Sequence, residues 1–352
     1  MNRYCARAPG KLILSGEHAV VYGAPAIVVA VARYTRVCFQ PFHRGSSLCT
    51  ALTGITRGRR LPLSALDRLR QKLDQRFEAF LAGQLSVNTI LQRPDDLILY
   101  TLAQCAKHVP VVGRTKTQSP LAAGRLKTFS DLPLGAGMGS SAAAIAATMV
   151  LYEHLLNRPQ TLAQRFEKVR FCERLQHGKG SAIDAAAVTF GGIQFLQEQN
   201  PCALDLSLKN WYWILSGIPE CSTGECVAFV RERHKQDTAL WQAFSDCTQA
   251  LKSVLTSEQS PADVMKENHD LLTKIGVVPE KTRFFIEQMN RCGGAAKISG
   301  AGAMRGHHGG MILVWHPDYE ALHHFLMQNY PALAWGKIEV ADCGAALCDD
   351  EQ

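Results

Sequence analysis

The feature that most constrains the fold is a glycine-rich segment that joins a strand to a helix. Residues 133–144 read PLGAGMGSSAAA, so alternating glycines are followed by serines and an alanine run. Glycines let backbone N–H groups approach an anion, and the first turn of a helix adds unpaired N–H donors. The segment therefore predicts a phosphate-binding turn before a helix. A plain turn with a serine cap is the alternative.

The spacing of these glycines differs from two familiar nucleotide-binding motifs. The P-loop requires G-x-x-x-x-G-K-[ST], and the dinucleotide loop requires G-x-G-x-x-G. GAGMGS lacks the third glycine at the dinucleotide spacing, and GAGAMRG at 300–306 places it one residue late. A nicotinamide oxidoreductase is therefore disfavoured. Because the loop contains no lysine, the positive charge expected beside a phosphate must come from elsewhere in the chain.

Short apolar runs alternate with segments of helical period along the chain. The apolar runs predict strands over 11–15, 26–37, 127–132, 191–196, 211–216, 295–299 and 311–315. The helical periods predict helices over 63–81, 95–108, 140–156, 161–176, 238–256, 261–274, 279–291 and 317–329. This pattern indicates a mixed α/β (α+β) fold, and the length of 352 residues suggests two domains. We place the boundary within 200–208 and expect domains at 1–205 and 206–352.

The composition excludes several classes of protein. The chain is 47% hydrophobic and 20% charged, which is typical of a globular enzyme. Its net charge of +7 is spread along the sequence and favours a small anionic ligand over nucleic acid. The apolar stretch 19–32 is too short to span a membrane. Without an apolar leader, the twelve cysteines predict a reduced, cytoplasmic protein. Cys221 and Cys226, and likewise Cys343 and Cys348, are expected to be buried structural thiols rather than zinc ligands.

The N-terminal segment offers a candidate for the missing charge. APGKLILSGEHAVVYG, at residues 8–23, places Lys11 beside a glycine at the start of a predicted strand. Glu17 and His18 follow in the turn after that strand. A lysine in this position would stabilise a phosphate bound by the glycine-rich loop, whereas a surface lysine is the alternative.

Two later segments carry residues suited to phosphoryl transfer. Residues 172–192 read CERLQHGKGSAIDAAAVTFGG, with Glu173 near a helix end and Asp184 after a glycine-bearing turn. Phosphoryl transfer needs one carboxylate to hold Mg²⁺ and another near the substrate hydroxyl. Residues 297–310, KISGAGAMRGHHGG, add a second strand-to-glycine loop. In isolation, the carboxylates are more simply explained as a capping aspartate and a surface glutamate. The loop is equally consistent with a bare turn between strands.

In this order and spacing, the segments resemble the GHMP kinase superfamily, named for galactokinase, homoserine, mevalonate and phosphomevalonate kinases. The resemblance extends from Ala8 to about Val314, and APGKLILSGEHAVVYGAPAI is most similar to the mevalonate kinase branch. It implies a two-domain GHMP kinase fold with the active site in the cleft between the domains. ATP, Mg²⁺ and a small anionic alcohol are the implied ligands, and the implied reaction converts mevalonate to 5-phosphomevalonate. Neither nucleic acid nor a membrane is expected as a partner, and a homodimer is the assembly considered.

The resemblance also implies roles for single residues. Asp184 matches the catalytic aspartate, which takes or orients the proton of the substrate hydroxyl. Lys11 matches the lysine beside it, which lowers the pKa of that hydroxyl. Glu17 and His18 match a motif in the network around the substrate.

Phosphate and metal binding are likewise implied by the resemblance. Ser141 and Glu173 match the Mg²⁺-binding pair. The residues of the phosphate-binding loop are Gly135, Ala136, Gly137, Met138, Gly139, Ser140 and Ser141. The residues of the third-motif loop are Ser299, Gly300, Ala301 and Gly302.

This chain departs from the family pattern in two places. After KISGAG, the sequence AMRGHHGG at 303–310 replaces a compact glycine run, so a longer loop would alter substrate choice or rate, or form a lid. Before Asp184, Gly180 and Ala182 replace the usual proline and glycine. A phosphomevalonate or homoserine kinase, or a non-catalytic sensor, stays open as an alternative. The candidates for binding a substrate carboxylate are Arg305, Lys179 and His18.

Overall fold

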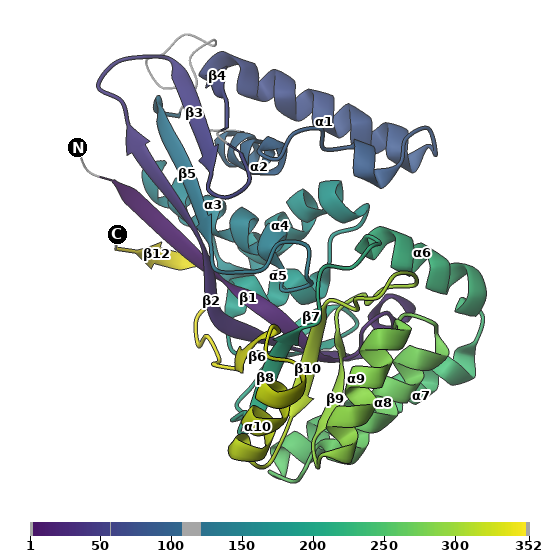
Figure 1. Cartoon of the computed structure of the whole chain (residues 1–352). Helices are drawn as coiled ribbons and strands as arrows, with labels where there is room; N and C mark the ends of the chain where they lie inside the picture. Colours follow the sequence, from purple (N-terminus) through teal and green to yellow (C-terminus); the bar gives the residue numbers. More distant parts are fainter. Residues whose placement is uncertain (1–2, 57, 108–120, 350–352) are drawn as a thin grey trace.

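The computed structural model describes residues 3–56, 58–107 and 121–349 of the chain. These residues form two β-sheets of unequal size, each packed against helices (Figure 1). We call them the large sheet and the small sheet. The predicted helix end at His108 lies outside the described residues.

The large sheet contains eight strands within the described ranges, and its main path runs β12-β1-β2-β5-β3-β4. Strand β6 pairs with β2, and β7 pairs with β6. The strands are β1 (Tyr4–Ser15), β2 (Ala26–Pro41), β3 (Ser47–Leu52), β4 (Arg60–Pro62), β5 (Gly124–Ser130), β6 (Ile193–Gln197), β7 (Asn200–Leu204) and β12 (Ala346–Cys348). Strands β3 and β5 pair in parallel, whereas β1 and β2 form a long antiparallel pair through the middle of the molecule (Figure 1).

The helices that pack with the large sheet follow from local sequence rules. They are α1 (Leu66–Leu81), α2 (Asp96–Ala106), α3 (Ser140–Leu155), α4 (Leu162–His177) and α5 (Ala182–Phe190), with short 3-10 turns η1 (Ala19–Tyr22), η2 (Leu63–Ala65) and η3 (Val87–Thr89). Helix α3 is buried over most of its length because its alanines form helix readily and pack closely. Helix α4 starts with a capping box between Thr161 and Gln164 and ends at the left-handed Gly178.

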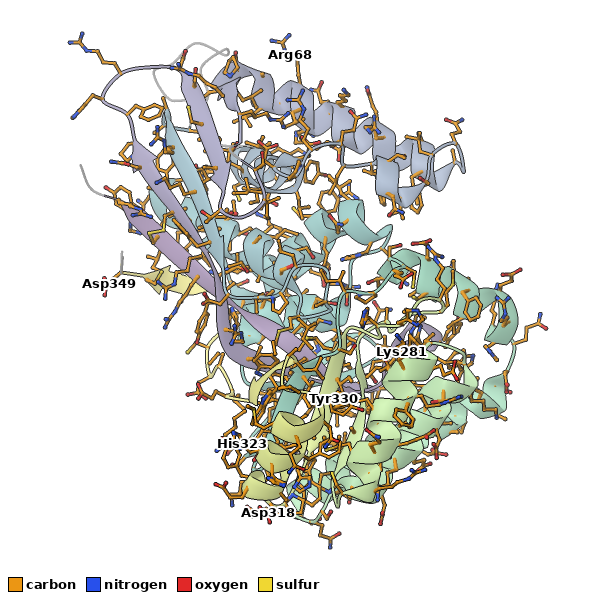
Figure 2. All side chains as sticks on the ribbon, viewed as in Figure 1. Arg68, Lys281, Asp318, His323, Tyr330 and Asp349 are labelled. Carbon is orange, nitrogen blue, oxygen red and sulfur yellow. A yellow bond between two sulfur atoms is a disulfide. The ribbon has the colours of Figure 1, made fainter. Side chains whose placement is uncertain are left out.

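The small sheet is antiparallel, with the order β11-β8-β10-β9. Its strands are β8 (Trp211–Leu215), β9 (Ala295–Ser299), β10 (Met311–Trp315) and β11 (Ala334–Lys337). The associated helices are α6 (Thr223–His234), α7 (Thr238–Thr256), α8 (Ala262–Lys274), α9 (Glu280–Arg291) and α10 (Tyr319–Asn329). Phe244 and Phe285 lie in the core that these elements enclose. In Figure 2, the labelled Lys281, His323 and Tyr330 mark this part of the molecule.

The predicted mixed α/β class is confirmed, and each predicted strand and helix is present with shifted ends. Strand β1 begins at Tyr4 rather than at residue 11, because Pro9 and Gly10 lie at a bulge inside it instead of ending it. The sequence prediction missed helices α5 and α6 and the short strands β3, β4, β7, β11 and β12.

The predicted domain boundary lies between β7 of the large sheet and β8, the first strand of the small sheet. Strand β7 ends at Leu204 and β8 begins at Trp211. Strand β12, however, returns from the C-terminal end of the chain to pair with β1. We therefore propose the division 1–205 and 206–352, with Ala346–Cys348 crossing back to the first part.

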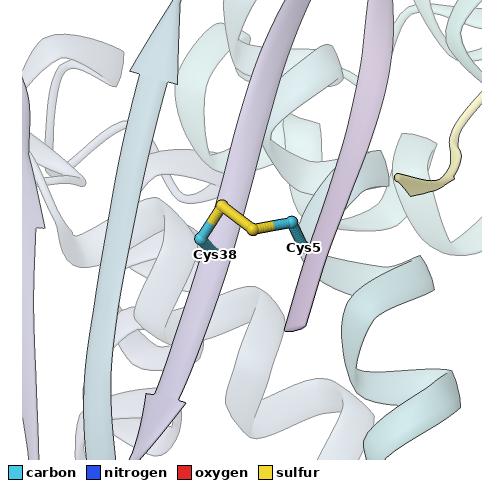
Figure 3. The surroundings of a disulfide bond; sticks show 2 residues. All are labelled: Cys5 and Cys38. Carbon is cyan, nitrogen blue, oxygen red and sulfur yellow. A yellow bond between two sulfur atoms is a disulfide. The ribbon is translucent and has the colours of Figure 1, made fainter. Parts of the chain in front are cut away.

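The prediction of a reduced chain is wrong. Cys5 of β1 and Cys38 of β2 form a disulfide bond, so the chain is not reduced throughout (Figure 3). The two residues are direct partners in the strand register, which brings together cysteines 33 positions apart.

Cys221 and Cys226 are buried thiols with their sulfurs 3.3 Å apart, as predicted. Cys343 is exposed and Cys348 is half-buried, so the prediction of buried thiols is wrong for that pair. In the part of the chain that the structure describes, no group of three or more histidine, cysteine, aspartate or glutamate side chains is placed to hold a metal ion.

The apolar stretch 19–32 forms η1 and the first part of β2. Over the described ranges, no helix is long and apolar enough to cross a membrane.

Candidate active site

A cavity of about 1110 Å³ opens where the two sheets meet. Strand β1, the loop 135–141 and the start of α5 contribute residues from the large-sheet part. Helix α6 and the loop at 300–301 contribute residues from the small-sheet part. Segments that are far apart in the sequence therefore share one cavity, in the position expected for a cleft between two domains.

An ion pair between Lys11 and Asp184 lies in this cavity. Lys11 Nζ is 3.1 Å from Asp184 Oδ1, and the lysine is almost completely buried. The bulge at Pro9 and Gly10 precedes Lys11 on β1, and the Lys11 N–H donates to the Met138 carbonyl at 2.9 Å. Asp184 lies in the first turn of α5, where its N–H donates to the capping hydroxyl of Ser181. A position just after the bulge in β1 and the capped start of α5 thus fix the pair.

Opposing effects determine the protonation of Asp184. Burial raises the pKa of this carboxyl, but the Lys11 ammonium and the Ser181 hydroxyl stabilise the charged form, so the pKa lies below its usual value. Asp184 is therefore ionised at neutral pH. An ionised carboxylate next to an ammonium group can accept a proton from a hydroxyl placed between them.

The glycine-rich loop packs directly on this ion pair. Gly135, Gly137 and Gly139 all have positive φ angles, a conformation that residues with a side chain rarely adopt. A Cβ atom at Gly139 would lie 2.8 Å from Lys11 Cγ and 3.2 Å from Asp184 Oδ1. Gly139 is also the N-cap of α3. Glycine is therefore required at 139, because only a backbone without a side chain brings the helix start this close to Lys11.

The loop has an inner and an outer side. Ala136 and Met138 are buried in the core, and the Ala136 carbonyl accepts a hydrogen bond from Met311 of β10. The residues that face the cavity are Gly135, Gly137, Gly139, Ser140 and Ser141. The structure therefore divides the predicted loop into anchoring positions and positions that can contact a ligand.

Ser141 and Glu173 lie together beneath the loop. The Ser141 hydroxyl donates to Glu173 Oε1 at 3.3 Å, and His177 Nε2 lies 3.9 Å from the same oxygen. Glu173 is fully buried, and its Oε2 atom has no hydrogen-bond partner among the described residues. Burial, followed by the negative charge of Asp184, raises the pKa of Glu173 well above its usual value. A buried carboxylate in which one oxygen lacks a hydrogen-bond partner is suited to binding a cation.

The third-motif loop follows β9 and approaches the phosphate loop from the opposite side. The Cα of Gly137 lies 3.9 Å from the position that a Cβ atom of Gly300 would occupy. His18 Nε2 lies 3.0 Å from the Ala301 carbonyl and joins the turn after β1 to this loop. Ser299 is buried, and its hydroxyl binds the backbone of Ile13. The loop thus contacts the first strand through side chains.

Two cationic residues besides Lys11 line the cavity, namely Lys179 and Arg231. Lys179 was a sequence candidate for a substrate carboxylate, whereas Arg231 was missed because no motif marks it. Arg305, another candidate, instead pairs with Glu225 at 2.7 Å and does not belong to the lining. The long loop at 303–310 is thereby tied to the start of α6.

The protonation of His18 leads to a testable prediction. Burial lowers the pKa of His18, against a smaller opposing effect of its bond to Ala301. As the pH falls below about 6.5, the unfolded chain binds a proton that the folded protein excludes, so stability decreases until the folded pKa is reached. Each pH unit within that window lowers the free energy of unfolding by about 1.4 kcal/mol. We expect His18→Asn to remove this dependence, because asparagine does not titrate. Asparagine also tolerates the positive φ at this position better than most residues.

The measurement is chemical unfolding of both proteins at pH 8 and at pH 5.5. The variant should lose less stability than the wild type between these values. Equal losses would show that His18 titrates alike in the folded and unfolded chains.

Comparisons with known proteins agree with this geometry. The family model described as GHMP kinases N terminal domain matches residues 101–192. The mevalonate kinase of Archaeoglobus fulgidus is 28% identical over 301 residues, covering 84% of this chain and 88% of that protein. The crystal structure of the Methanococcus jannaschii mevalonate kinase has a TM-score of 0.76 at 18% identity and covers 96% of this chain and 99% of that one. The crystal structure of the Lactococcus lactis galactokinase has a TM-score of 0.73 at 13% identity and covers 98% of this chain and 95% of that one. The fold alone therefore does not identify the substrate. Residues 101–192 thus match the GHMP kinase N-terminal domain family, and the chain is similar to mevalonate kinases over most of its length.

Proposed function

We propose that the protein transfers the γ-phosphoryl group of ATP to the primary hydroxyl of mevalonate, giving 5-phosphomevalonate and ADP. The observation that carries this proposal is the Lys11–Asp184 ion pair, held against Gly139 of the glycine-rich loop inside the shared cavity. The similarity to mevalonate kinases over most of the chain favours mevalonate as the alcohol.

Different residues of the cavity would perform different parts of the reaction. The loop at 135–141 and the start of α3 would hold the phosphates through backbone N–H groups. The substrate hydroxyl oxygen would form a bond to the γ-phosphorus while the bond to the β-phosphate oxygen breaks. The proton of the substrate hydroxyl would pass to the Asp184 carboxylate. The Lys11 ammonium would stabilise the negative charge on the oxygens of the transferred phosphoryl group. Positioning and electrostatics account for most of the rate enhancement in such a site.

Ser141 and Glu173 fit a Mg²⁺ site. Carboxylate and hydroxyl oxygens suit Mg²⁺, and the buried Glu173 Oε2 lacks a hydrogen-bond partner in the described structure. When bound with ATP, the ion would neutralise charge on the β- and γ-phosphates. His177 lies within 3.9 Å of Glu173, and burial lowers the pKa of His177, so it remains neutral beside the proposed ligand.

The carboxylate of mevalonate requires a cation at the other end of the substrate. Lys179 and Arg231 line the cavity and are exposed enough to move towards a ligand. We propose that one or both bind this carboxylate. Arg305 is excluded from this role while it pairs with Glu225.

A substrate panel tests the proposed function directly. ADP release would be measured with ATP, Mg²⁺ and each of mevalonate, phosphomevalonate, homoserine and galactose. We expect kcat/KM for mevalonate to exceed the others by at least about 100-fold, because buried polar groups left unpaired by a wrong substrate are costly. Preference for another alcohol would contradict the assignment of mevalonate, and no turnover with any of them would favour a non-catalytic member.

Asp184→Asn tests the proton acceptor. The variant keeps the shape of the side chain but loses its charge, so we expect kcat to fall at least about 100-fold, on the order of 2.7 kcal/mol, while ATP still binds. The control is Asp263→Asn, which removes an exposed carboxylate from the first turn of α8. A variant that retains more than about a tenth of the wild-type kcat would rule out this role for Asp184.

Glu173→Gln tests the metal site. Because an amide is a weaker ligand than a carboxylate, we expect the Mg²⁺ concentration for half-maximal rate to rise at least about ten-fold. Glu167→Gln, at an exposed position on the same helix, should leave that concentration unchanged. An unaltered Mg²⁺ titration in Glu173→Gln would remove this residue from the site.

A further inference from the structure

A second buried ion pair lies behind the cavity and joins the two sheets. Lys297 of β9 binds Glu17 in the turn after β1, and both side chains are almost fully excluded from solvent. Burying two charges is costly, and an apolar pair of similar volume often gives equal or greater stability. The presence of this pair therefore calls for an explanation other than stability.

The ammonium group of Lys297 reaches three acceptors. Besides Glu17, it donates to the Ile298 carbonyl at 2.9 Å and to the Ile13 carbonyl at 3.4 Å. Ser299 adds to the same contact, because its hydroxyl accepts from the Ile13 N–H at 2.8 Å and donates to the Ile13 carbonyl at 3.2 Å. Both backbone polar groups of Ile13 are thus bonded to side chains of β9.

These bonds lie two residues from Lys11 on the same strand. The Lys11 N–H is bonded to Met138 of the phosphate loop, so β1 is held by that loop at Lys11 and by β9 at Ile13. The turn that carries Glu17 is also tied to the third-motif loop through His18 and Ala301. Lys297 is thus at the centre of the contacts that set the distance between Lys11 and the loop at 299–302.

The charges reinforce this geometry. Burial raises the pKa of Glu17, and the positive charges of Lys297 and, less strongly, Lys11 lower it. The carboxylate of Glu17 therefore lies within the electrostatic range of both lysines. Its Oε2 atom has no hydrogen-bond partner within the described residues, so removal of Lys297 would leave a buried carboxylate with no direct ion-pair partner.

We propose that Lys297 is a positioning residue for phosphoryl transfer, which acts through Glu17 and Ile13 to hold Lys11 in register with the two glycine loops. This proposal rests on the proposed kinase function and adds a residue that touches neither ATP nor the alcohol. Lys297 is absent from the lining of the cavity, in agreement with an indirect role.

The test is Lys297→Met, which keeps an unbranched side chain and removes the charge. We expect kcat to fall at least about ten-fold while the KM for ATP changes less than about three-fold, because the phosphate loop keeps its own bonds. The double variant Glu17→Gln, Lys297→Met should recover part of the lost kcat, because it leaves no unpaired charge buried. An equal kcat in the single and double variants would overturn the role given to the ion pair.

Two controls separate positioning from general destabilisation. Met289→Ala removes a fully buried side chain of α9 without touching Ile13 or Glu17, and Lys274→Met removes an exposed lysine. Rates are compared at a temperature where every variant is folded. A Lys297→Met variant with kcat within about three-fold of the wild type, or a Met289→Ala variant with an equal loss, would overturn the proposal.

A readout without substrate keeps this test independent of the proposed function. Hydrogen exchange of peptides covering residues 10–18 should be at least about ten-fold faster in Lys297→Met than in the wild type, because the Ile13 carbonyl and the Glu17 carboxylate lose the ammonium group that ties this segment to β9. Unchanged exchange would overturn the proposal whichever alcohol the enzyme phosphorylates, whereas failure of the substrate panel alone would overturn only the function.

Discussion

The ion pair between Lys11 and Asp184 joins the first strand of the chain to the start of a helix more than 170 positions later, and the rest of the site is arranged around it. Strand β1 must bulge at Pro9 and Gly10 to carry Lys11 into the cavity. Helix α5 must start at Ser181 to present Asp184 in its first turn. The glycine-rich loop must lack a side chain at residue 139, because a Cβ atom there would collide with the lysine.

The same pair explains how charge is distributed in the cavity. The Lys11 ammonium keeps Asp184 ionised. Burial, followed by the charge of Asp184, raises the pKa of Glu173. Two neighbouring buried carboxylates are unfavourable unless enough positive charge shares the site. The electrostatics of the cavity therefore support the proposed Mg²⁺ position, in addition to the resemblance of Ser141 and Glu173 to a metal-binding pair.

Much of the site could be predicted because its residues stand in short, local patterns. The alternation of glycines at 135–139 predicts a turn at a helix start, and the structure places Lys11, Ser141, Glu173 and Asp184 around that turn. The roles of these residues stay predictions until variants are assayed. The α/β class followed from the alternation of strand and helix patterns, which is a local property of the chain.

The features that were missed depend on contacts between distant parts of the sequence. Helix α5 is short and apolar on nearly all sides, so its period does not distinguish it from a strand. Lys297 appears in the sequence as an ordinary lysine before a glycine loop, and its importance emerges only when Glu17, 280 positions away, lies beside it. The pairing of Cys5 with Cys38 likewise follows from the strand register, which the sequence pattern did not define.

A crystal structure with mevalonate, Mg²⁺ and a non-hydrolysable ATP analogue would test the central claim most directly. We expect the primary hydroxyl oxygen to lie about 3–3.5 Å from the γ-phosphorus and within hydrogen-bonding distance of Asp184, with Lys11 beside the γ-phosphate. A γ-phosphate bound away from Gly139 and Ser141, or a hydroxyl out of reach of Asp184, would contradict it.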